Sequence, residues 1–216
     1  MNPELLIERF PRLYHMAEDG SWPSIKKNGL LSTSRLLDLY DVRGRERAAL
    51  EQRHRPESVS IRQAGLPVAV VRDQKPMSDA GLQRCLQDGL APKDWYRTLN
   101  SMCFFWLTEE RLFRLLEAKP YRTLSHTVLT VDTASILFSH SKRVRLCPIN
   151  SGCTKPFPHE RGKDTFLPIV QYPFDDWDKK RSRKDPIVEF AVLDGVLDIA
   201  KHTIEVRRMT GRKVLK

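Results

Sequence analysis

The fold of this chain is decided by a late apolar strand, Ile187-Val188-Glu189-Phe190-Ala191-Val192-Leu193. Its β-branched and aromatic residues favour extended structure, and the Asp194-Gly195 pair that follows is a turn signal. A single acid, Glu189, interrupts the apolar run. If the sheet has one solvated face, alternation directs Glu189 to water; if both faces are covered, Glu189 is a buried acid with a raised pKa. The residues alone leave both interpretations open.

Short strand and helix patterns alternate on either side of this strand. Further strands are predicted at 12–16, 67–72, 102–106, 127–131, 144–146 and 203–209. Between them the pattern predicts helices, including one long charged helix over 34–52 and one that Thr108 caps. Irregular structure is predicted at 54–66, over 147–186 with its six prolines, and in a frayed basic tail at 210–216. The sum predicts one α+β domain over 1–216, with a mixed or antiparallel core of about six short strands.

The composition is that of a well-solvated globular protein with a strong positive charge. Of 216 residues, 40% are hydrophobic and 30% are charged, and the net charge is +10. Such an excess attracts polyanions, so nucleic acid is the expected partner. No apolar run approaches the ~18 residues that span a bilayer, and the N-terminus lacks a signal-peptide core. We therefore expect a cytoplasmic protein, assumed monomeric, with no membrane partner.

The four cysteines and the basic runs are further candidates for binding sites. The cysteines show no C-x-x-C spacing, so no metal site is expected. The positive charge is concentrated in residues 35–55, 179–184 and the tail. Phosphate contacts position a nucleic acid without reading its sequence, and the candidate contacts are Arg45, Lys179, Lys180, Arg181 and Arg183. A solvated charged surface is an equally open interpretation.

Three motifs carry a resemblance to a known family. Tyr14-His15 lies in a short strand before a helix that ends at Gly29-Leu30-Leu31; Cys103-Phe104-Phe105-Trp106 runs into a second helix; and Glu189 lies in the late strand. In this order the motifs resemble the ADP-ribosyltransferase superfamily, in particular the DarT-type DNA ADP-ribosyltransferases. The resemblance implies an ADP-ribosyltransferase-like fold, NAD as the ADP-ribose donor, and DNA rather than RNA as the acceptor. It also implies a toxin, with an antitoxin or a cognate hydrolase as partner.

The resemblance assigns roles to the motif residues nearest the reaction. Glu189 is the expected catalytic carboxylate, since breaking the bond between nicotinamide and ribose develops positive charge on the ribose. The same carboxylate can act as base for the acceptor. His15 is expected to bind the ribose hydroxyls of NAD, and a satisfied core histidine is the alternative. Tyr14 and Leu31, from the same motif, are expected at the NAD site.

Further roles are assigned to aromatic and basic residues. Phe105, Trp106 or Phe113 is expected to stack on nicotinamide, although each could equally belong to the core. An arginine is expected to assist the reaction, and Arg72, which follows a short strand, is the first candidate, with Arg45 and Arg161 as rivals. Arg161 is also a candidate for binding the NAD diphosphate. Asn150 begins a turn, Asn150-Ser151-Gly152, whose backbone N–H groups could be donors at the NAD site; a plain loop turn is an equally open interpretation.

Three other functions remain open. An RNA 2′-phosphotransferase relative would share this fold, but it requires a more basic active site than the motifs provide. A basic nucleic-acid-binding module on an inactive transferase fold would bind without turning over NAD. Transfer to a protein side chain is opposed only weakly by the charge. We therefore expect an NAD-dependent mono-ADP-ribosyltransferase acting on nucleic acid, with these as alternatives.

Overall fold

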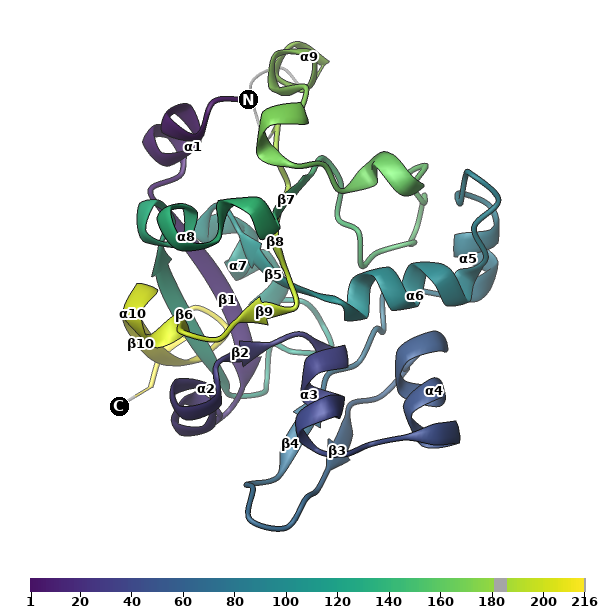
Figure 1. Cartoon of the computed structure of the whole chain (residues 1–216), viewed down its shortest axis with the longest axis vertical. Coiled ribbons are helices and arrows are strands. Elements are labelled where there is room, and N and C mark those ends of the chain that lie inside the picture. Colours follow the sequence, from purple (N-terminus) through teal and green to yellow (C-terminus); the bar gives the residue numbers. More distant parts are fainter. Residues whose placement is uncertain (181–185, 216) are drawn as a thin grey trace.

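A seven-stranded antiparallel sheet forms the centre of the protein (Figure 1). The computed structural model describes residues 1–180 and 186–215. Within them the strand order is β11-β10-β6-β1-β5-β8-β7, and helices pack around the sheet, which confirms the α+β class. The strands of the sheet are β1 (Arg12–Glu18), β5 (Met102–Trp106), β6 (His126–Asp132), β7 (Val144–Cys147), β8 (Glu189–Leu193), β10 (Thr203–Thr210) and β11 (Lys213–Val214).

The three motif strands lie side by side in this sheet. Strand β1 pairs with β5, and β5 pairs with β8. The register places Tyr14 opposite Trp106 and Trp106 opposite Glu189. Segments that are distant in the sequence therefore meet on adjacent strands, and this arrangement positions the candidate site.

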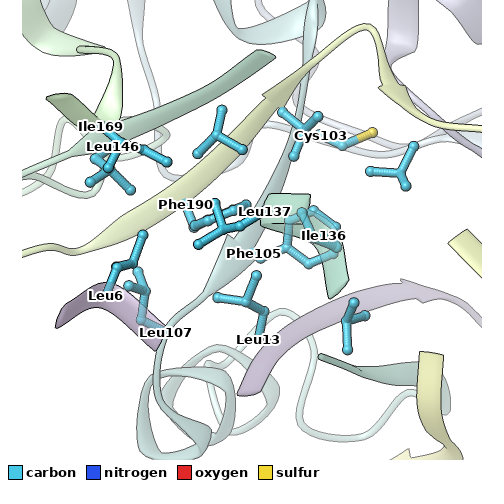
Figure 2. Packing of buried hydrophobic residues seen from close by; sticks show 14 of the residues in the cluster. Leu6, Leu13, Cys103, Phe105, Leu107, Ile136, Leu137, Leu146, Ile169 and Phe190 are labelled. Atoms are coloured by element: carbon cyan, nitrogen blue, oxygen red, sulfur yellow. The ribbon is translucent and has the colours of Figure 1, made fainter. Parts of the chain in front are cut away.

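Both faces of the sheet are covered. On one face, leucines and isoleucines of α1 (Pro3–Arg9), α8 (Thr133–His140) and α10 (Ile199–His202) pack against the strands around Phe105 and Phe190 (Figure 2). On the other face, α7 (Glu109–Leu116) packs its buried Leu112 and Leu116 against β1, β6 and β10. Because apolar side chains from both faces leave water, the central strands have no solvated side.

Residues 33–100 form a lateral lobe beside the sheet. One small core joins α3 (Thr33–Leu39) and α4 (Gly44–Gln52) to the hairpin of β3 (Val59–Ile61) and β4 (Ala69–Val71). A second joins α5 (Asp79–Gln83) and α6 (Pro92–Asn100) around Trp95 and Tyr96. The lobe therefore has apolar contacts of its own and forms a separate wall next to the sheet.

Three of the predicted elements differ from the structure. The single helix over 34–52 is wrong, since Asp41 and Gly44 adopt positive φ angles of 52° and 58° and separate α3 from α4. Strand β3 lies within the segment 54–66 that was expected to be irregular, because it pairs with β4. The tail is not frayed up to residue 215, since Thr210 and Lys213 pair across a turn at Gly211, which joins β10 to β11.

The long segment 147–186 is irregular for most of the part that is described. It holds the short 3-10 turns η2 (Lys163–Thr165) and η3 (Ile169–Gln171), and the structure adds a helix, α9 (Phe174–Lys180). A further 3-10 turn, η1 (Ser141–Arg143), precedes β7. The proline-rich composition thus predicted that this segment is mostly irregular, but it did not predict helix α9.

A second, two-stranded pairing attaches the helix of the first motif to the sheet. Helix α2 (Trp22–Asn28) leads into β2 (Leu30–Leu31), which pairs with β9 (Gly195–Val196) directly after β8. Gly195 has a φ of 101°, and a Cβ there would overlap the carbonyl oxygen of Leu30. Only glycine satisfies both the backbone conformation and the close approach.

We expect Gly195→Ala to destabilise the protein by about 3 kcal/mol, because strain at positive φ and displacement of Leu30 add together. Gly65→Ala is a matched control, since Gly65 also has positive φ, 78°, but its Cβ would meet nothing within 4 Å. Gly65→Ala should lower the free energy of unfolding by only about 1 kcal/mol. Denaturant unfolding of both variants measures the difference, and equal costs would show that the close approach at Gly195 is unimportant.

Candidate functional site

A cleft of about 570 Å³ lies between the central strands and the lateral lobe. Its wall is formed by residues of β1, β2, β5 and the start of β8, together with residues of α2, α3 and β4. It brings together most of the residues that the motifs singled out. These are His15, Leu31, Arg72, Phe105, Trp106, Asn150 and Glu189. Tyr14 and Arg161 are not part of its wall.

Glu189 is the first residue of β8 and is a buried acid, with 5% of its surface exposed. The solvent-facing alternative is wrong because both faces of β8 are covered. The Ser151 backbone N–H donates to Glu189 Oε1 at 3.2 Å. Among residues 1–180 and 186–215, no group hydrogen-bonds to Oε2. One carboxylate oxygen is therefore held in place, and the other is buried with its hydrogen-bonding capacity unused within the described residues.

Burial raises the pKa of Glu189 from 4.5 to about 7. The hydrogen bonds from Ser151 oppose this rise most strongly, and the positive charge of Arg161 opposes it less. Because desolvation disfavours the charged form, the carboxyl is poised to titrate near neutral pH. That range suits a group that accepts a proton during a reaction.

A raised pKa predicts that Glu189 contributes less to stability as pH increases. Folded protein keeps the proton between pH 4.5 and about 7, whereas unfolded chain has lost it, so stability is fully present below 4.5 and falls across this window. We expect the free energy of unfolding of wild type, compared with that of Glu189→Gln, to fall by about 3 kcal/mol across this pH window. Above the window the difference should stay constant. Urea unfolding of both proteins from pH 4 to 8.5 tests this, and a difference that does not vary with pH would contradict it.

His15 on β1 is held in one tautomer. Its Nδ1 lies 2.8 Å from the carbonyl oxygen of Phe104, and a carbonyl can only accept, so Nδ1 carries the proton. Burial lowers the pKa of His15 to about 4, and the ring is therefore neutral in the physiological range. Nε2 keeps its lone pair and can accept a hydrogen bond from a ligand hydroxyl in the cleft.

Arg72, directly after β4, is oriented by groups that no sequence motif had singled out. Its guanidinium carbon lies 5.2 Å from the ring centre of Tyr121, and Nη1 is 3.5 Å from His126 Nδ1. The Tyr121 hydroxyl in turn donates to Asp73 at 2.6 Å. A second hollow of about 490 Å³ shares Arg72 with the cleft, so this cation lies at the border of two cavities. No spacing in the sequence links residues 72, 121 and 126.

The aromatic candidates differ in how much ring surface they offer. Phe105 is 1% exposed and packs edge-on to Phe190 in the main core, so little of it is available for stacking. Trp106 is partly buried and contributes to the cleft wall. Tyr14 packs against the cluster under α7. Trp106 therefore has more ring surface than Phe105 for a stacking ligand.

The predicted turn after β7 borders the cleft and also donates a backbone hydrogen bond to Glu189. Asn150 is exposed, and Asn150, Ser151 and Gly152 line the cleft, while the Ser151 N–H is used by Glu189. Arg161 lies behind this turn, fully buried, and donates to three backbone carbonyls. The turn thus supplies a backbone donor to Glu189, while its role in binding NAD stays a prediction. Arg161 is not part of the cleft wall, where a diphosphate ligand would lie.

The candidate nucleic-acid contacts do not form one surface. Arg45 is exposed on α4 and Lys179 is exposed on α9, and these helices lie well apart, α9 at the top and α4 at the lower right of Figure 1. Lys180 is the last residue of α9, and Arg181 and Arg183 lie outside the described residues. Ion pairs to neighbouring acids involve three other arginines near Arg45, namely Arg35, Arg43 and Arg47.

His140, Asp198 and His202 form a cluster of metal-ligating residue types away from the cleft. Arg143 Nη2 lies 2.8 Å from His140 Nδ1, and because arginine only donates, the neutral ring carries its proton on Nε2. Nε2 then donates to Asp198 at 2.7 Å. A metal ion would bind a ring nitrogen through its lone pair, but Nε2 of His140 carries a proton and Nδ1 already accepts from Arg143. The cluster therefore fits a hydrogen-bonded link between α8 and α10 better than a metal centre.

Comparison with known proteins identifies the family but not its activity. No curated protein and no solved structure matches the chain. In the described part of the chain, no helix combines the length and apolar character needed to cross a membrane. One family model, described as a family of unknown function, matches residues 11–203. Since this range covers most of the chain and includes five of the seven strands of the sheet, among them β1, β5 and β8, the chain belongs to the DUF7002 family of unknown function.

Proposed function

We propose that this protein is a mono-ADP-ribosyltransferase that transfers ADP-ribose from NAD to nucleic acid, with DNA preferred over RNA. The observation that carries the proposal is the meeting of His15, Arg72 and Glu189 at one cleft. There Glu189 has one oxygen fixed by Ser151 and, among the described residues, no hydrogen-bond partner for the other. A buried acid at the wall of a cleft that also holds a neutral histidine and an arginine suits the cleavage of a glycosidic bond in a negatively charged donor.

The proposed step breaks the bond between C1′ of the ribose and the nicotinamide nitrogen, and the bonding electrons leave with nicotinamide. Positive charge develops on the ribose, and the ionised Glu189 carboxylate in the cleft wall stabilises it electrostatically. A nitrogen of the acceptor base supplies the electron pair for the new bond to C1′. Its proton passes to the Glu189 carboxylate, whose pKa near 7 suits this transfer.

His15 and Arg72 bind and orient the donor in this proposal. His15 Nε2 accepts a hydrogen bond from a ribose hydroxyl, because Nδ1 is committed to the Phe104 carbonyl. Arg72 provides a fork of donors for the diphosphate and is held in place by its contact with Tyr121. Both residues fix the ribose relative to Glu189, which lowers the entropic part of the barrier.

The choice of nucleic acid as acceptor is supported by charge. The net charge of +10 attracts polyanions, and Arg45 and Lys179 are exposed on separate helices. The resemblance to DarT-type enzymes favours DNA and suggests that an antitoxin or a hydrolase that removes ADP-ribose acts with this protein in the cytoplasm.

The proposal is tested by incubating the protein with labelled NAD and four separate pools: single-stranded DNA, duplex DNA, RNA and protein. We expect label on DNA, removed by nuclease and not by protease. Transfer to the protein pool alone would reject the acceptor but keep the enzyme class. Salt-dependent DNA binding with no release of nicotinamide would reject the enzyme in favour of a binding module.

A further inference from the structure

We infer that Arg161 is a positioning residue for Glu189, acting through the Ser151 turn, and not a ligand for NAD phosphate; this inference rests on the proposed function. Arg161 is 1% exposed. Its three kinds of nitrogen each donate to a backbone carbonyl: Nε to His159 at 2.9 Å, Nη1 to Ser151 at 2.8 Å and Nη2 to Cys153 at 2.9 Å. These bonds engage the guanidinium with the protein itself.

The same turn receives support from the lateral lobe. The Trp95 indole Nε1 donates to the Ser151 carbonyl at 3.2 Å, and the Arg161 guanidinium lies 5.6 Å from the Trp95 ring centre. Ser151 therefore has two donors on its carbonyl, while its own N–H donates to Glu189 Oε1. A continuous chain of contacts links α6 and Arg161 to the carboxylate.

The shape of the arginine side chain accounts for its presence here. A planar guanidinium can reach three carbonyls in different directions, whereas a lysine ammonium has one nitrogen and cannot hold His159, Ser151 and Cys153 together. Its positive charge also favours the ionised form of Glu189, although less strongly than the Ser151 bonds do. Its hydrogen bonds to Ser151 and Cys153 hold the turn, so Arg161 acts on Glu189 through geometry as well as through charge.

The test is Arg161→Lys, which keeps the charge and removes the fork. We expect kcat for transfer to fall about 10- to 100-fold, because a small displacement of Glu189 is costly. KM for NAD should change less than about twofold, since no donor contact is lost. The pH midpoint of kcat should move upward, because weaker hydrogen bonding from Ser151 disfavours the carboxylate.

Two further variants keep the test informative. Trp95→Phe removes one donor to the Ser151 carbonyl. It should lower kcat and raise its pH midpoint, each by less than Arg161→Lys does. This variant tests the inference if Arg161→Lys does not fold. Arg143→Lys is the matched control, because Arg143 donates to the carbonyls of Leu193 and Gly195 outside the cleft wall. It should leave the pH midpoint unchanged.

The outcomes separate positioning from phosphate binding and from failure of the proposed function. A raised KM for NAD with unchanged kcat and pH midpoint would overturn the inference and make Arg161 a donor ligand. If wild type shows no transfer at all, the proposed function fails, but positioning is still measurable without activity. Each protein is then compared with its own Glu189→Gln partner in urea unfolding. The upper edge of the pH-dependent window should lie higher in the Arg161→Lys variant than in wild type, and an unmoved edge would reject positioning.

Discussion

Glu189→Gln is expected to lower the rate of ADP-ribose transfer by at least about 10³-fold, because it removes both the charge that stabilises the ribose and the base that takes the acceptor proton. Glutamine has nearly the same shape and can still accept the Ser151 N–H at its carbonyl oxygen. The fold should therefore persist, and above pH 7 the variant should be more stable than wild type, since it carries no buried charge.

The measurement is single-turnover transfer of labelled ADP-ribose to the best DNA substrate, with unfolding curves recorded in parallel. Glu8→Gln makes the same chemical change on the exposed side of α1 and should retain wild-type rates. Activity in Glu189→Gln within tenfold of wild type, in protein shown to be folded, would remove Glu189 from the mechanism. Loss of activity together with loss of folding would be decided by Glu189→Asp, which keeps the charge but withdraws it from the ribose.

His15→Ala carries the second large expectation, a loss of about 10- to 100-fold in affinity for NAD, since a ribose hydroxyl left buried without its acceptor costs about 1–3 kcal/mol. The tautomer explains the direction: Nδ1–H is taken by the Phe104 carbonyl, so Nε2 is the atom that can bind a hydroxyl. The effect should appear in KM or in direct binding more than in kcat. Because the pKa of His15 is about 4, its contribution to affinity should not vary between pH 5.5 and 8.

Calorimetric titration with NAD at several pH values checks both the size of the loss and the lack of pH dependence from His15. His159→Ala is a suitable control, because that side chain is exposed on the long segment before η2. Equal affinities for His15→Ala and wild type would mean that His15 is a core residue satisfied by Phe104 alone. An affinity that falls with a midpoint near pH 6.5 would contradict the burial-lowered pKa.

Local sequence signals predicted the parts of the fold that depend on neighbouring residues. The runs at 102–106 and 203–209 are strands because β-branched and aromatic side chains suit a pleated surface. Thr108 caps α7 as predicted, by accepting the Arg111 N–H at 3.4 Å. The helix over 34–52 failed because the breaks at Asp41 and Gly44 involve positive φ angles that helical periodicity does not reveal. Strand β3 was missed because it has only three residues within a polar segment and is stabilised by pairing with β4.

In the candidate site, too, local sequence predicted some features and only tertiary contacts established the others. Its residue types could be read from the chain directly, namely an isolated acid in an apolar strand, a histidine in another, and a turn at Asn150-Ser151-Gly152. Contacts between distant segments establish that β1, β5 and β8 are adjacent, that Glu189 is buried on a sheet covered on both faces, and that the turn donates to it. The same contacts turn Arg161 away from the cleft. Burial, pKa and the direction of a guanidinium all depend on which segments pack together, and no local pattern encodes that packing.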